Sequence, residues 1–172
     1  KDLFAENGIE VPTTWSELVS ACETLTAAGT PCMTAGGSDG WPIFVGAYGL
    51  LGSAFPDANA LVEGLWTGEI EYTSDEWVDL LSKYQIYNRD MMEPGASALP
   101  GDGAPGRFAS GAVAMFPGGT WYGPAIEANE PAFDWGYIPF PGSDDPEMNK
   151  FMFGKYDQGW AIAEGSSKKD EA

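Results

Sequence analysis

The stretch from Phe108 to Trp121 reads FASGAVAMFPGGTW and constrains the fold more than any other part of the chain. Residues 112–116 form an unbroken apolar run between turn signals, which predicts a strand buried on both faces. The residues before this run are expected to end a short helix at Gly111, because glycine readily takes the left-handed conformation of a helix C-terminus. A helix followed directly by a buried strand is typical of an α/β fold.

The glycine turn after this strand holds the first candidate binding residues. Gly119 offers bare backbone, and Thr120 is expected to cap a helix that runs through Ala125 and Ile126. Such a turn exposes backbone donors at the carboxyl end of a strand, where open α/β sheets bind ligands. Trp121 is placed at this rim, where its indole could stack on a sugar ring. The alternative is a purely structural joint in which Trp121 packs into the core.

The remainder of the chain predicts one α/β domain with a mixed sheet flanked by helices. Thr14 with Glu17, and Thr73 with Glu76, match the capping-box pattern at the start of a helix. The helix at 41–51 is apolar nearly all round and is expected to be buried. Apolar residues recur every three or four positions along 77–87, which places them in the core. The expected helices are 1–7, 14–28, 41–51, 58–66 and 73–90, and the further expected strands are 31–34, 134–139 and 160–162.

Two longer stretches are expected to be loops. Residues 93–106 are rich in Gly, Pro and Ala, and residues 141–149 are polar. The second stretch contains Asp144, Asp145 and Glu147, but their spacing departs from that of a calcium-binding loop. We therefore expect a solvated acidic surface loop there and no metal site.

Composition restricts the ligands that the chain can bind. Its net charge is −18 and it contains no histidine, which argues against nucleic acid as a partner, because phosphates need a basic face. The same charge disfavours small anions, so neutral ligands fit best. Without histidine the usual serine or cysteine triad cannot form, and the glycine turn lacks a phosphate-loop lysine, so no cofactor is expected. Strong acidity also favours a dispersed monomer.

The two cysteines of the chain are Cys22 and Cys32. Cys22 falls on the apolar face of the helix at 14–28, and Cys32 begins the strand at 31–34, so the two could lie close together in the core. In an exported protein they could form a disulfide worth about 2–3 kcal/mol. Two buried free thiols are the alternative.

The residues expected at the rim of the domain suit a neutral polyol. They comprise aromatic plates, hydrogen-bonding side chains and bare backbone, and they are Trp41, Trp121, Ser38, Asp39, Thr120, Asp157, Gln158 and Gly119.

Three segments resemble the sugar-binding proteins of ABC importers, the extracellular family that includes maltose-binding protein. Residues 1–33 resemble the passage that opens the second lobe of that family, with its pattern YNKDLF…G…P.TW.E. The stretch FASGAVAMFPGGTW matches the family pattern F..G.aAM...G.W. Residues 154–172, GKYDQGWAIAEGSSKKDEA, match GG.g.aI...SKnkeaA.

This resemblance implies a fold of two α/β lobes that close on a sugar around a hinge. Residues 1–172 would be most of the second lobe, of the periplasmic-binding-protein type II class, cut at both ends. The family's members are not enzymes. They capture a carbohydrate outside the cytoplasmic membrane, in the periplasm or as a lipoprotein on the cell surface, and deliver it to the permease subunits of the transporter.

The resemblance also implies roles for individual residues. Trp121 falls on the family's stacking tryptophan, with Gly119 and Thr120 in the turn before it. Trp41 matches a tryptophan–proline pair next to a ligand-contacting loop, here 37–39. Asp157 and Gln158 occupy a turn that often reads Gly-Gly in the family, and this departure leaves their role open. Lys155 and Tyr156 are weaker candidates.

Two other classes of function compete with this one. A carbohydrate-active enzyme domain would use two of the carboxylates, about 5–9.5 Å apart in a cleft. Asp39 and Asp157 are the pair to examine first. An interaction module would instead present its tryptophans on a flat face to a protein partner.

Overall fold

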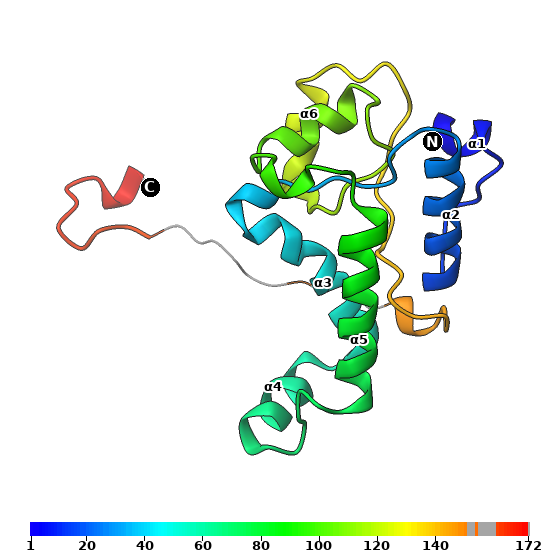
Figure 1. Cartoon of the computed structure of the whole chain (residues 1–172). Coiled ribbons are helices and arrows are strands. Elements are labelled where there is room, and N and C mark those ends of the chain that lie inside the picture. The colour runs from blue at the N-terminus through cyan, green and yellow to red at the C-terminus, as the bar shows by residue number, and fades with distance from the viewer. Residues whose placement is uncertain (151–153, 155–160, 172) are drawn as a thin grey trace.

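The computed structural model describes residues 1–150, 154 and 161–171 (Figure 1). Its α-helices are α1 (Asp2–Glu6), α2 (Trp15–Ala27), α3 (Trp41–Ala54), α4 (Ala58–Thr67), α5 (Asp75–Ile86), α6 (Gly103–Ala109) and α7 (Gly123–Glu127). Single turns of 3-10 helix are η1 (Gly37–Asp39), η3 (Ala96–Ala98), η4 (Thr120–Tyr122), η5 (Met148–Lys150) and η6 (Lys169–Glu171), and a π-helical turn, η2 (Tyr87–Met91), continues α5. Within the described part of the chain, no helix is long and apolar enough to cross a membrane.

Three extended segments run parallel at the centre of the molecule. Met33 forms a parallel bridge with Met92 on one side and with Met115 on the other. The Met33 amide donates to the Met91 carbonyl at 3.0 Å, and the Met115 amide donates to the Cys32 carbonyl at 2.9 Å. The molecule therefore has the beginning of a parallel sheet, one residue long on each side of Met33.

The expected mixed sheet is not found in the described residues. The segments at 31–34 and 112–116 contribute the bridges at Met33 and Met115, and the segment at 134–139 pairs with no other segment that the structure describes. Part of the expected strand at 160–162 lies outside the described residues, and the rest is irregular. The apolar run predicted burial correctly at Val113, but burial is not pairing, because a strand also needs a continuous ladder to a neighbour.

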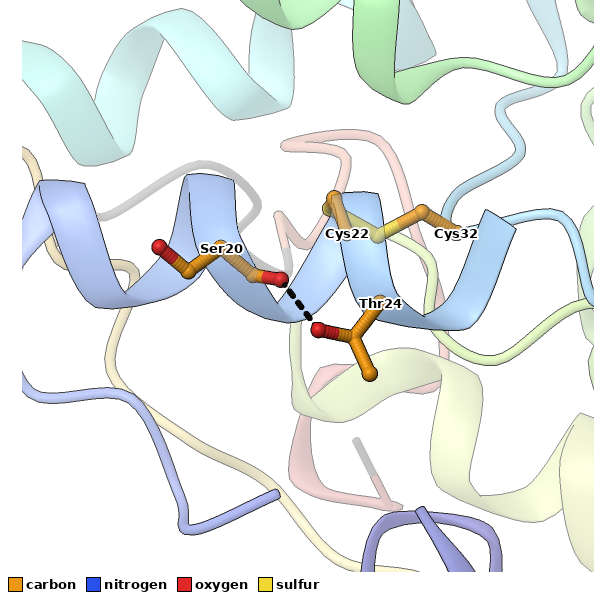
Figure 2. The surroundings of a disulfide bond; sticks show 4 residues. All are labelled: Ser20, Cys22, Thr24 and Cys32. Atoms are coloured by element: carbon orange, nitrogen blue, oxygen red, sulfur yellow. Dashed lines mark hydrogen bonds between the residues drawn. A yellow bond between two sulfur atoms is a disulfide. The ribbon is translucent and has the colours of Figure 1, made fainter. Parts of the chain in front are cut away.

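Helix α2 has the expected start and the expected buried face. The Thr14 hydroxyl accepts from the Glu17 amide at 3.3 Å, and the Glu17 carboxylate accepts from the Thr14 amide at 3.1 Å, which confirms this capping box. Its buried residues are Trp15, Leu18, Ala21, Cys22 and Leu25. Cys22 forms a disulfide with Cys32, and the two Cα atoms are 4.9 Å apart (Figure 2). The disulfide therefore joins α2 to the central parallel segments.

Helix α3 is less buried than its composition predicts. It packs against α5, and Pro42, Gly46 and Leu50 are buried, but Trp41 and Phe44 are 48% and 54% exposed. On α5, Leu80 is buried as expected, as is Tyr87 in the turn that follows. Leu81 was expected in the core and is exposed. An apolar pattern identifies the side chains of a helix that tend to be buried, but it does not show which other segments pack against them.

The second expected capping box is wrong. Helix α5 begins after Ser74, and the hydroxyl of Thr73 donates instead to the Glu71 carboxylate at 3.1 Å. Because Ser74 is the N-cap, Glu76 lies one position too early in the helix to complete a capping box. The long loop expected at 93–106 is also shorter than predicted, because α6 begins at Gly103. Helix α6 ends where predicted, because Gly111, just after the helix, has the left-handed φ of 73°.

The acidic loop at 141–149 exposes Asp144, Asp145 and Glu147, as expected, but a buried asparagine fastens it to the core. Asn149 is 8% exposed. Its side-chain oxygen accepts from the Ser53 hydroxyl and from the Ser143 amide, both at 2.9 Å. Its side-chain nitrogen donates to the carbonyls of Thr13 and Ser143, both at 2.8 Å. Asn149 thus joins α3 and the entry of α2 to this loop.

Candidate functional site

The structure brings the two predicted tryptophans together. Trp41 is the first residue of α3 and Trp121 lies in η4, and their ring centroids are 6.2 Å apart with an angle of 52° between the planes. Trp121 is 59% exposed, so the alternative in which it packs into the core does not hold. Two partly exposed indoles from distant parts of the chain therefore form one aromatic surface, which we call the tryptophan pair.

Tyr122 supports this pair and was not among the predicted residues. Its ring is buried and stacks on Trp41 with a centroid distance of 6.3 Å and an interplanar angle of 10°. Burial raises the pKa of the Tyr122 hydroxyl, and the nearby carboxylates of Asp39 and Asp102 raise it further. The hydroxyl therefore stays protonated and donates to the Gly101 carbonyl at 3.5 Å. Its position directly after Trp121, on the inward side of the same turn, is the signal that could have identified it.

Gly119 is required for the position of Trp121 itself. A Cβ atom on residue 119 would lie 1.8 Å from Cζ3 of the Trp121 ring, a distance that no real contact allows. The expected Thr120 helix cap is not present, because η4 follows Gly119 and α7 starts only at Gly123, next to Pro124. Proline lacks an amide hydrogen and fits the first turn of a helix, which explains the late start. Thr120 is exposed, and its carbonyl accepts from the Tyr137 hydroxyl at 3.4 Å.

Ser38 and Asp39 lie in η1, which Gly40 separates from Trp41. One Asp39 oxygen accepts from the Gly101 amide at 2.9 Å, and the other accepts from the Ser38 hydroxyl at 3.3 Å. Both residues remain exposed. A carboxylate offers about four lone-pair positions, so Asp39 fastens the loop at Gly101 and still has room to accept ligand hydroxyls.

Asp157 and Gln158 lie outside the described residues, as do Lys155 and Tyr156. Six of the eight predicted binding residues are therefore placed. Trp41, Ser38 and Asp39 come from one loop and helix start, while Gly119, Thr120 and Trp121 come from the other. Because the Trp41 and Trp121 rings have centroids 6.2 Å apart, the residues of the first segment lie next to those of the second.

The acids of the loop at 141–149 have partners within the protein. Asp144 accepts from the Ser16 amide at 2.7 Å, and Glu147 pairs with Lys150 at 2.6 Å. Among residues 1–150, 154 and 161–171, no three acidic or cysteine side chains are grouped as a metal site requires.

The whole chain is similar to known proteins. The family model of the bacterial extracellular solute-binding protein matches residues 1–172. A multiple sugar-binding protein of Streptococcus mutans serotype c is 28% identical over 148 residues, which are 83% of this chain and 35% of that protein.

Two solved structures share the fold of this chain. The apo form of RafE from Streptococcus pneumoniae matches with a TM-score of 0.72 at 23% identity, over 84% of this chain and 38% of that one. A chitin oligosaccharide binding protein matches with a TM-score of 0.71 at 27% identity, over 83% of this chain and 36% of that one. The chain thus spans little more than a third of the length of these relatives. Because the family model covers every residue, the chain belongs to the bacterial extracellular solute-binding protein family.

Proposed function

We propose that this chain is one lobe of a receptor that captures a neutral carbohydrate outside the cytoplasmic membrane. The observation that carries the proposal is the exposed tryptophan pair, held beside the polar loop at Ser38 and Asp39. Aromatic faces take up the apolar face of a sugar ring, and carboxylate and backbone groups take up its hydroxyls. The names of the relatives, a multiple sugar-binding protein and a chitin oligosaccharide binding protein, point to the same class of ligand.

This chain would be the second of the receptor's two lobes, which close on the sugar. Asp157 and Gln158 would add contacts from the same lobe. The loaded monomer, periplasmic or held on the cell surface as a lipoprotein, would then deliver its ligand to the permease subunits of an ABC importer. No chemical step is required of the protein, and the net charge of −18 favours a neutral ligand over an anionic one.

One lobe supplies only part of the binding free energy. Hydrogen bonds to charged groups contribute about 1.5–3 kcal/mol each, and micromolar binding needs about 8 kcal/mol in total. We therefore expect the 172-residue chain to fold but to bind sugars only at millimolar concentration. A longer protein with both lobes would bind in the micromolar range.

The test is to titrate a panel of neutral mono- and oligosaccharides into the 172-residue chain and into the longer protein with both lobes. Tryptophan fluorescence and calorimetry measure the binding. Trp121→Ala should abolish binding. Trp66→Ala is the matched control, because Trp66 is 91% exposed on α4 and should leave binding unchanged. Figure 1 shows α4 at the end of α5 away from α6. Absence of binding to every sugar in the longer protein would overturn the proposal, and release of reducing sugar from an oligosaccharide would favour the enzyme alternative.

A further inference from the structure

Two carboxylates lie beside the tryptophan pair, joined to it through Gly101. Asp39 Oδ2 accepts from the Gly101 amide at 2.9 Å, and Asp102 follows Gly101 in the chain. The Gly101 carbonyl accepts from the Tyr122 hydroxyl at 3.5 Å, and the Tyr122 ring stacks on Trp41. Burial is the main cause of the raised pKa of Tyr122, and the charges of both carboxylates add to it. Both negative charges therefore act at the aromatic surface.

Neither carboxylate is neutralised by a positive side chain. Asp39 and Asp102 are exposed, and neither forms an ion pair with a lysine or arginine in the described part of the chain. Asp39 also accepts from the Ser38 hydroxyl, which leaves about two of its four lone-pair positions for a ligand. Arg107, four residues after Gly103 on α6, is bound to Glu93. The site is thus negative and open to a positively charged group.

The two indoles supply a second feature that favours a cation. Trp41 is 48% exposed and Trp121 is 59% exposed, and their ring planes are inclined at 52° with centroids 6.2 Å apart. The face of an indole carries partial negative charge and attracts a cation that lies within about 6 Å of the ring centroid. Two exposed rings this close together offer such contacts to one small ligand.

We propose that this site takes a protonated amino sugar in preference to a neutral sugar with the same ring. The C–H groups of the sugar ring stack on one indole. The ammonium group lies over the other indole and donates to the Asp39 carboxylate, while Asp102 adds its negative charge. An ammonium group has three donors and no acceptor, so it suits carboxylate oxygens better than a hydroxyl does. The inference rests on the proposed function, because it adds a preference among carbohydrates at the same site, where neutral sugars bind more weakly.

A matched set of monosaccharides tests this preference. The 172-residue chain with ¹⁵N-labelled tryptophan is titrated with glucosamine, N-acetylglucosamine and glucose at about pH 6, below the pKa of an amine, and sodium chloride equalises the ionic strength. The indole N–H signals of Trp41 and Trp121, assigned by single Trp→Phe substitutions, report binding. Glucosamine should bind about threefold to tenfold more tightly than either neutral sugar. Raising the salt to about 0.5 M should reduce this ratio, because salt screens exposed charges.

Asp102→Asn separates the charge from the shape of the site. The Asp102 side chain does not cap α6, so the substitution should leave the fold and glucose binding unchanged and weaken glucosamine binding about twofold. Glu63→Gln is the matched control, because it removes one exposed negative charge from α4 and should leave the binding of both sugars unchanged.

The outcomes distinguish this preference from the receptor proposal. If glucosamine binds no more tightly than the neutral sugars, or if Asp102→Asn weakens its binding no more than Glu63→Gln does, the preference is overturned and the receptor proposal stands. If glucosamine binds and the neutral sugars do not, the preference holds and the ligand of the receptor is cationic instead of neutral. If no indole responds to any sugar, both are overturned.

Discussion

The ring of Trp121 lies against Gly119 so closely that a Cβ on residue 119 would be 1.8 Å from its Cζ3. Gly119→Ala should therefore turn the indole away from Trp41 and weaken sugar binding about threefold to tenfold. The φ of Gly119 is −104°, which alanine adopts without strain, so the free energy of unfolding should change by less than about 1 kcal/mol. Sugar titration and urea unfolding measure the two effects. Gly165→Ala, where a Cβ meets nothing within 4 Å, is the control.

Asn149 should be worth more to stability than its place in a surface loop indicates. Asn149→Ala removes four hydrogen bonds to Ser53, Thr13 and Ser143, and it leaves partly buried groups without partners. We expect a loss of about 2–3 kcal/mol in urea unfolding. Glu147→Ala is the comparison, because it removes only an exposed pair with Lys150 and should cost less than about 1 kcal/mol. Equal effects of the two substitutions would contradict the prediction.

Reduction of the disulfide should destabilise the chain without unfolding its helices. The bond between Cys22 and Cys32 closes a loop with a sequence separation of 10, for which the chain-entropy model gives about 2–3 kcal/mol. Unfolding of the wild-type chain with and without reductant measures this difference. The Cys22→Ala, Cys32→Ala double variant should have the stability of the reduced chain and should not respond to reductant. An identical midpoint for oxidised and reduced wild type would show that the bond contributes nothing.

The ion pair between Glu93 and Arg107 should make the free energy of unfolding depend on pH in the acidic range. Arg107 Nε donates to Glu93 Oε1 at 2.7 Å, and the Glu93 side chain is only 8% exposed. Burial raises the pKa of this carboxyl, but the hydrogen bonding and positive charge of Arg107, together with the nearby Thr34 hydroxyl, outweigh burial, and the pKa is lowered below its ordinary value. A lowered folded-state pKa means that the stabilisation is complete above the unfolded-state pKa, near 4.5, and is lost as the pH falls through the folded-state value.

Glu93→Gln tests this pH dependence. At pH 6 the substitution should cost about 1–2 kcal/mol, a value reduced by the partial exposure of Arg107. The difference between wild type and variant should shrink as unfolding is measured at successively lower pH, towards pH 3. A difference that stays constant across this range would show that the carboxylate charge does not matter. Other carboxyls also titrate in this range, so only the difference between the two proteins is informative.

Helices were predictable from sequence because their signals are local. The capping box at Thr14 and Glu17 needs only four consecutive residues, and Gly111 needs only its own backbone freedom. The box expected at Thr73 failed because the helix begins one residue later, with Ser74 as its N-cap, so that Glu76 is the second helical residue and not the third. Strands were less predictable, since a ladder depends on a partner elsewhere in the chain. Residues 134–139 have the composition of a strand and no paired neighbour among the described residues.

The binding site also divides into residues that local sequence identifies and contacts that depend on distant segments. Spacing and residue type identified Trp41 and Trp121 separately, but their 6.2 Å approach depends on how distant segments pack. Tyr122 was missed because a buried aromatic beside an exposed one reads simply as core.

The disulfide has a consequence beyond stability, because it fixes the register of the central segments. Cys32 directly precedes Met33, the residue that bridges both neighbouring segments. If the segment slid by one residue, successive side chains would exchange faces and Cys32 would turn away from α2. The covalent bond forbids this slip. The loop that leads to Trp41 therefore always starts from the same point, and the alignment of the two indoles is set by a bond in the core as well as by their own contact.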